Sequence, residues 1–221
     1  MFHMTRRTSL AITTTLMAML ILSACGGGGG SSSSAPPVAA NPQTPPPAPA
    51  PADIVLAPTY TAISAAVTFS RSNWPEWNQT GTGAVNGVAC YVSGGNYHVH
   101  ALLSIYQDGV RLAVPGSVGR NSACDYELHT HEGSGTIHVE TDVAKTFTLG
   151  QFFALWGQNL GATSVAGLPG TPTYYVIENE KVTRITSSPA DITLTAHKEV
   201  VIITGVPPKE VPKYDWATSG L

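Results

Sequence analysis

Short apolar runs separated by turn-forming residues fill the chain from about residue 57 onward, a pattern typical of β-strands. In three places two runs lie close enough to form a hairpin: 98–115, 126–141 and 173–186. Their turns are predicted at Asp108-Gly109, at Gly133-Ser134-Gly135 and near Asn179-Glu180. Glycine in the first two turns tolerates the positive φ that a tight turn needs. Further strands are predicted at 60–70 and 190–205.

One helix interrupts the strands, in the segment "TFTLGQFFALWGQNLG". Thr148 and Gln151 fit a capping box. In this motif the threonine side-chain oxygen accepts a hydrogen bond from the backbone N–H of the glutamine, and the glutamine side chain reaches back to the backbone N–H of the threonine. Four large apolar side chains then share one helical face: Leu149, Phe152, Phe153 and Trp156. We expect this face to close one end of the core. The predicted fold is mainly β, an antiparallel β-sandwich or partly open barrel with one short α-helix.

The first 24 residues have the order of regions that an export signal has. Two arginines precede an apolar run (10–22) that is too short for an ordinary membrane span. The following "LSAC", residues 22–25, resembles the lipobox of bacterial lipoproteins. This resemblance implies that residues 1–24 are a signal peptide and that Cys25 carries acyl chains such as palmitate, so that the protein's partner is a lipid bilayer. Gly26, in place of aspartate, implies the outer membrane of the cell envelope if the cell is Gram-negative.

Residues 25–56 are almost free of charge and of large apolar side chains. Such a Gly/Ser/Pro-rich segment buries too little surface to offset its ordering entropy, so we predict a disordered linker behind the lipid anchor. The remaining residues, 57–221, are long enough for one β-rich domain with its own core.

The charge of the mature chain is acidic. Without the two arginines of the signal, 9 basic residues face 14 acidic ones. We find no basic patch, and this balance argues against nucleic acid as a partner. The sequence indicates no particular protein partner.

Histidine is concentrated in the first two predicted hairpins, which hold five of the seven in the chain. Because side chains alternate along a strand, His98 and His100 share one face, and so do His129 and His131. After the second turn, His138 and Glu140 share a face in the same way. Apolar residues occupy the positions between them, and we expect that apolar side to face the core.

Two cysteines lie just before these histidine segments, Cys90 before the first and Cys124 before the second. In an exported protein such a pair usually forms a disulfide. A disulfide would hold the two segments close together, and their imidazoles would then form a single patch.

Imidazole with a nearby carboxylate is a ligand set for transition metals. All four methionines lie in the signal, and we expect both cysteines of the domain to be oxidised. No soft ligand therefore remains, which argues against Cu(I) carriers and blue-copper sites. The expected cofactor is a divalent transition metal, Zn²⁺ or Cu²⁺ in preference to Fe or Mn. Its expected ligands are His98, His100, His129, His131, His138 and Glu140.

Four segments, "HVHALLSIYQDGVRLAVP", "LHTHEGSGTIHVE", "FTLGQFFALWGQ" and "ITLTAHKEVVIITG", resemble in their order a family of exported bacterial and archaeal proteins. The resemblance runs from about Cys90 to the C-terminal "YDWATSGL" and implies that the histidine hairpins and the aromatic helix belong to one domain. It implies no activity.

The sequence leaves three functions open. The first is an envelope lipoprotein whose domain binds a metal through these histidines. The second is a metal-dependent enzyme at the same site, for which Glu132 is the candidate general base. The third is a cell-surface interaction module without a metal, in which the histidines form a pH-responsive face. His197, alone near a predicted turn, is expected to be structural.

Overall fold

The computed structural model describes residues 54–63, 72–91 and 95–221, which lie within one unit of the chain, Ala48–Leu221. None of the helices in this described part is long and apolar enough to cross a membrane. The predicted signal peptide, the lipobox with Cys25 and nearly all of the linker lie outside the described residues. So does most of the strand predicted at 60–70.

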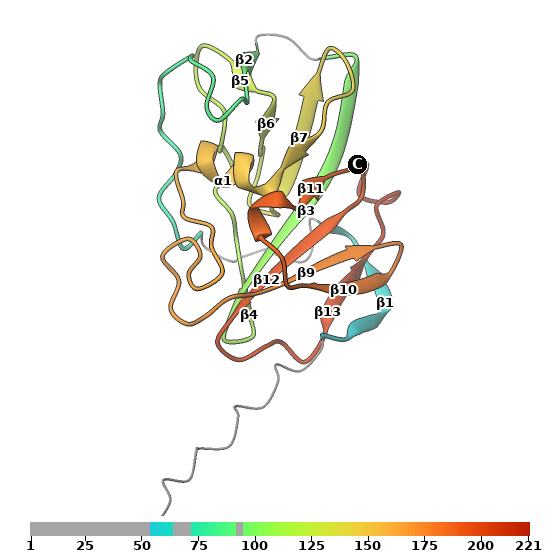
Figure 1. The fold of residues 1–221 in the computed structure, drawn as a ribbon. Helices are drawn as coiled ribbons and strands as arrows, with labels where there is room; N and C mark the ends of the chain where they lie inside the picture. The colour runs from blue at the N-terminus through green and yellow to red at the C-terminus, as the bar shows by residue number, and fades with distance from the viewer. Residues whose placement is uncertain (1–53, 64–71, 92–94) are drawn as a thin grey trace, which may run out of the picture. The chain divides into compact units, whose positions relative to one another are not determined.

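A seven-stranded sheet forms the frame of the domain (Figure 1). Its strands in spatial order are β10 (Lys181–Ile185), β9 (Thr173–Glu178), β12 (Glu199–Thr204), β3 (Tyr97–Gln107), β7 (Thr136–Thr141) and β6 (Leu128–His129). Strand β4 (Val110–Leu112) pairs with the second half of β3. Neighbouring strands are antiparallel except β3 and β12, which are parallel. The mainly β fold predicted from the sequence is confirmed, and the sheet does not close into a barrel.

The three predicted hairpins are all present. β3 and β4 turn at Asp108 and Gly109, which both have positive φ, and β9 and β10 turn at Asn179 and Glu180, which do as well. β6 and β7 are antiparallel partners, with His129 opposite His138.

Three two-stranded pairs surround this frame. They are β1 (Leu56–Thr61) with β13 (Val211–Tyr214), β2 (Cys90–Tyr91) with β5 (Asp125–Tyr126), and β8 (Phe147–Thr148) with β11 (Thr193–Leu194). β1 and β13 are parallel, whereas the other two pairs are antiparallel. A short 3₁₀ helix, η2 (Pro189–Asp191), precedes β11.

The helix α1 (Leu149–Trp156) begins at the predicted capping box and ends at Gly157, whose φ is 77°. Its large apolar residues are buried, as the sequence predicts. Two tryptophans from the loop before β2 complete this core. The indole N–H of Trp77 donates to the carbonyl of Leu155 at 2.9 Å, and Trp74 packs edge-on against Trp156. The helix therefore holds the loop that precedes β2.

Alternation along β3 divides its side chains between two faces of the sheet. Ala101, Leu103 and Ile105 are buried in the main core with α1, which confirms the predicted core side. His98 and His100 project from the other face.

The face that carries the histidines is covered at its other end. Leu102 packs there with Ile63 and Tyr214, and Tyr106 packs with Val211. Strands β1 and β13 supply much of this cover, while the histidines belong to none of the hydrophobic clusters formed by the described residues. The imidazoles thus lie on a part of the sheet that solvent reaches at His98 and His131.

Candidate metal centre

Strand register places the predicted ligands opposite one another. His138 on β7 has His100 of β3 as its direct partner on one side and His129 of β6 on the other. His98 lies opposite Glu140 in the next row. Side chains of directly opposed residues on antiparallel strands project to the same face with Cβ atoms about 5 Å apart. The sheet therefore gathers these side chains in one patch, as the sequence predicts.

The first group of ligand nitrogens comes from His98, His100 and His138. The Nδ1 atom of His138 lies 3.0 Å from Nε2 of His98 and 3.1 Å from Nε2 of His100. A carboxylate oxygen of Glu140 lies 3.1 Å from the same Nε2 atom of His98. Glu140 is therefore adjacent to this group without being one of its three members.

The second group comes from His129, His131 and, again, His138. The Nε2 atoms of His129 and His131 are 3.0 Å apart. The Nδ1 atom of His129 is 2.8 Å from the carbonyl oxygen of Tyr126, to which it donates its proton. This bond leaves the lone pair of His129 on Nε2, which is the atom that faces the group.

The spacing within each group fits a transition-metal ion. Each group has three ligand atoms within 4.8 Å of one another, so all three lie within about 2.8 Å of a common centre. Zn–N bonds are about 2.0–2.1 Å long, and modest side-chain rotations would bring the nitrogens to that distance. The domain therefore contains histidine groups that could hold a metal.

Burial favours the neutral form of four of these imidazoles, those of His100, His129, His131 and His138. It lowers the pKa of His100 to about 4, with the charge of His98 as the next cause. It also lowers the pKa of His138 to about 2, and the other histidines of the patch add to this effect. The pKa values of His129 and His131 are lowered, again chiefly by burial. Neutral imidazoles bind metal without first losing a proton from the charged form.

Arg120 is a neighbour of the site that no sequence pattern indicates. Its Nη1 atom lies 3.2 Å from Nδ1 of His131, while its Nε atom pairs with Asp125 at 3.0 Å. Arg120 comes from the loop that precedes β5, and only the fold brings it to the histidines. This guanidinium orients the exposed imidazole of His131.

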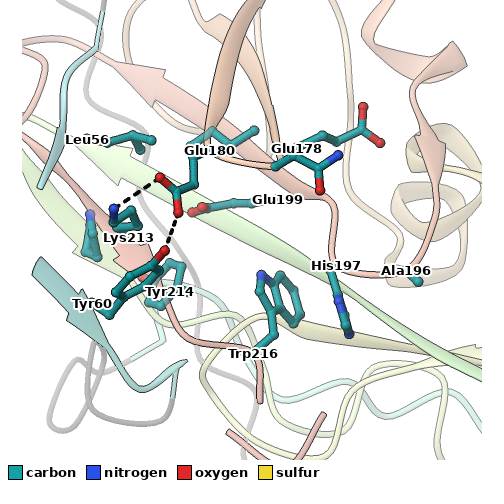
Figure 2. Close-up of a pocket in the computed structure, with 13 residues that line it drawn as sticks. Leu56, Tyr60, Glu178, Glu180, Ala196, His197, Glu199, Lys213, Tyr214 and Trp216 are labelled. Atoms are coloured by element: carbon teal, nitrogen blue, oxygen red, sulfur yellow. Dashed lines mark hydrogen bonds and ion pairs between the residues drawn. The ribbon is translucent and has the colours of Figure 1, made fainter. Parts of the chain in front are cut away.

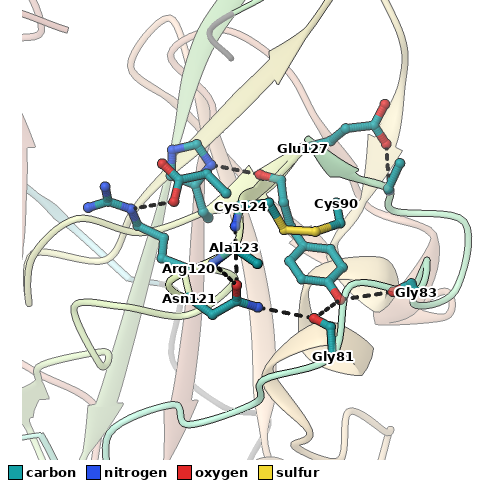
Figure 3. The surroundings of a disulfide bond; sticks show 12 residues. Gly81, Gly83, Cys90, Arg120, Asn121, Ala123, Cys124 and Glu127 are labelled. Atoms are coloured by element: carbon teal, nitrogen blue, oxygen red, sulfur yellow. Dashed lines mark hydrogen bonds and ion pairs between the residues drawn. A yellow bond between two sulfur atoms is a disulfide. The ribbon is translucent and has the colours of Figure 1, made fainter. Parts of the chain in front are cut away.

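The predicted disulfide between Cys90 and Cys124 is present and joins β2 to the residue just before β5, with Cα atoms 5.8 Å apart (Figure 3). Around it, the amide of Asn121 donates to the carbonyl of Gly81 at 3.0 Å, and its oxygen accepts from the Cys124 N–H. The cross-link therefore fixes the segment whose Tyr126 carbonyl orients His129.

Gly119, in the loop before β5, lies against the backbone of β6. Its φ is 76°, and a Cβ atom there would lie 2.3 Å from the carbonyl oxygen of Leu128 and 3.2 Å from Cβ of His129. Gly119→Ala is expected to lower the free energy of unfolding by about 2 kcal/mol or more, because the backbone is strained and β6 must move. Urea denaturation of this variant beside Gly83→Ala, where a Cβ would meet nothing within 4 Å, measures the effect. Equal stabilities of the two variants would contradict it.

Glu132 is a member of neither histidine group. It is exposed, and one carboxylate oxygen accepts from the Ser134 backbone N–H at 2.8 Å while the other accepts from the Ser134 hydroxyl. The carboxylate closes the turn before β7, and this contact accounts for its position.

His197 lies at the border between the histidine patch and a cavity of about 330 Å³ (Figure 2). Its backbone N–H donates to the carbonyl of His100 at 2.8 Å, and its ring stacks on Trp216. On the other side of the cavity, the Glu180 carboxylate binds Lys213 and Tyr60. His197 belongs to neither ligand group.

Glu199 also lines this cavity and is buried. The Ser104 hydroxyl donates to its carboxylate at 2.6 Å. Burial raises the pKa of Glu199 from 4.5 to about 7, although the Ser104 bond and the charge of Arg111 oppose this change. The folded protein therefore holds this proton to a higher pH than the unfolded chain does.

The raised pKa predicts a pH-dependent effect of Glu199→Gln. Between pH 4.5 and about 7 the folded state binds more protons, so wild-type stability falls as pH rises through that window. Glutamine stays neutral and keeps the Ser104 bond. The variant is expected to match the wild type near pH 4.5 and to exceed it by roughly 2–3 kcal/mol at pH 8. Urea denaturation at both pH values, with exposed Glu210→Gln as the control, tests this; a variant that is less stable at pH 8 would contradict it.

Comparison with protein-family models, with curated proteins and with solved structures finds no match for this chain.

Proposed function

We propose that this protein is a lipid-anchored envelope protein whose β-domain binds a divalent transition metal through imidazole ligands. The observation that carries this proposal is the pair of three-histidine groups on β3, β7 and β6 with the segment that follows β6. Three features support it: the opposed strand register, the neutral state of the buried imidazoles and the Tyr126 carbonyl that presents Nε2 of His129.

The ligand chemistry favours Zn²⁺ or Cu²⁺. The donors are imidazole nitrogens with Glu140 beside them, a set that suits both ions and, less selectively, Fe or Mn. The disulfide removes Cys90 and Cys124 as thiolate ligands. A softer ion such as Cu(I) would find neither thiolate nor thioether in this patch.

Metal binding is tested by titrating the full chain, extracted from membranes in detergent and treated with a chelator, with Zn²⁺ and Cu²⁺. Calorimetry should show saturable binding. The variant His98→Ala/His131→Ala, which removes one exposed ligand from each group, should bind at least about tenfold more weakly. His197→Ala should bind as the wild type does. If the double variant binds the metal as tightly as the wild type does, the histidine patch is not the binding site.

The lipid anchor is supported by the lipobox-like "LSAC" and by the long Gly/Ser/Pro-rich segment behind it. Two acyl chains on Cys25 would hold the chain on a bilayer stably, and the segment would give the domain reach. Cell fractionation of the Cys25→Ser variant tests this step. We expect the wild type in the membrane fraction and the variant in the soluble fraction of the envelope; an unchanged membrane location would contradict the anchor.

A further inference from the structure

The two histidine groups share one member, His138, and this overlap bears on how many ions the centre takes. His138 lies on the middle strand of three, with His100 opposite it on β3 and His129 opposite it on β6. Neighbouring strands are about 4.8 Å apart, so the outer two histidines approach the His138 ring from opposite sides. His98 joins His100 in the group on the β3 side, and His131 joins His129 in the group on the β6 side.

One ion cannot take all five imidazoles in this arrangement. Two ligand atoms of the same ion are separated by at most twice the bond length, about 4.2 Å for Zn–N. The ligand nitrogens of the five histidines do not all lie within 4.8 Å of one another. They form two groups that each meet this limit. Zinc sites moreover use four ligands as a rule, fewer than the five imidazoles and the carboxylate present here.

The ring of His138 can serve both groups because imidazole has two nitrogens. Its Nδ1 atom is already the member that faces His98 and His100, at 3.0 and 3.1 Å. Its ring also contacts the β6 side: its centroid is 4.2 Å from that of His131, and it stacks on His129 at 5.2 Å with an interplanar angle of 10°. Because Nδ1 faces His98 and His100, we assign the ring's other nitrogen, Nε2, to that side.

We propose that the centre is dinuclear, with two divalent ions bridged by the imidazolate of His138. This inference rests on the proposed metal-binding function. The first ion is bound by His98, His100 and Nδ1 of His138, and the second by His129, His131 and Nε2 of His138. Neutral His138 has one N–H proton, which the second ion displaces to solvent as it binds.

The two positions differ in their surroundings. Glu140 lies 3.1 Å from the ligand nitrogen of His98, so a carboxylate can complete four ligands at the first position. At the second position three imidazoles are present, and the neighbouring side chain is the cation Arg120. A metal with three protein ligands retains an open coordination position, the arrangement of catalytic sites as opposed to closed structural ones. The second position is thus the one at which a small anionic or neutral ligand would bind, beside Arg120.

The experiment uses Cu²⁺ as the probe because two Cu²⁺ ions joined by an imidazolate couple antiferromagnetically. The full chain in detergent is freed of metal, loaded with Cu²⁺ and desalted. Bound copper is counted, and the electron paramagnetic resonance signal is integrated at low temperature. We expect two ions per chain and a signal well below that of two independent spins. His98→Ala and His131→Ala, at exposed positions, should each retain one ion with its full signal, and His197→Ala should match the wild type.

The outcomes separate the two proposals. One ion per chain with its full signal overturns the dinuclear centre and leaves metal binding in place. Two ions with two full signals overturn the bridge through His138. No bound copper overturns the proposed function itself. His138→Ala provides a further check, because it should abolish the coupling whether or not ions remain bound.

Discussion

Saturating Zn²⁺ is expected to stabilise the domain strongly, and His138→Ala is expected to remove most of this stabilisation. A ligand present at 1,000 times its dissociation constant adds about 4 kcal/mol to the free energy of unfolding when it binds the folded state alone. For a domain of this size that corresponds to a rise of roughly 10 °C in melting temperature. His138 belongs to both ligand groups found among the described residues, so its loss weakens both of them.

Thermal unfolding with and without Zn²⁺ measures this effect. His98→Ala and His131→Ala should each reduce the shift in part, because each belongs to one group only. His197→Ala lies outside both groups and should keep the whole shift. A His138→Ala variant that folds and is stabilised by Zn²⁺ as much as the wild type would refute the assignment of this residue as a ligand.

Removal of the disulfide is expected to lower the free energy of unfolding by roughly 3–4 kcal/mol. The bond joins residues 34 positions apart, and the expected value follows from the loop-closure entropy that it removes from the unfolded chain. Metal affinity should fall as well, by about tenfold or more, because the cross-linked segment holds the Tyr126 carbonyl against His129.

Urea denaturation of Cys90→Ala/Cys124→Ala against the wild type, each with and without a reductant, tests this prediction. Reductant should destabilise the wild type toward the level of the variant and leave the variant unchanged. An equal midpoint for the two proteins would show that the cross-link contributes nothing. If the variant is destabilised but binds Zn²⁺ with unchanged affinity, the disulfide does not contribute to metal binding.

Much of the fold could be predicted because its signals are local. Period-2 alternation placed His98 and His100 on one face and the apolar residues between them on the core side, and the structure has both. The dipeptide Asp108-Gly109 indicated a hairpin turn, and the capping box at Thr148 indicated the start of α1. Each of these features depends on residues only a few positions apart.

The geometry of the site could not be predicted in the same way, because it depends on register between distant strands. A shift of β6 by one residue would turn His129 to the core side, and nothing within 126–141 fixes that register alone. The parallel pairing of β3 with β12, the approach of Arg120 to His131 and the carbonyl of Tyr126 behind His129 are likewise tertiary contacts. The sharing of His138 between two groups appears only when β7 is placed between β3 and β6.

Metal analysis of the protein isolated from the cell envelope, without added metal or chelator, tests the central claim most directly. The quadruple variant His98→Ala/His100→Ala/His129→Ala/His131→Ala, purified in parallel, gives the background. We predict that the wild type carries stoichiometric zinc or copper and that the variant carries neither. A wild-type protein as free of metal as the variant would contradict the account.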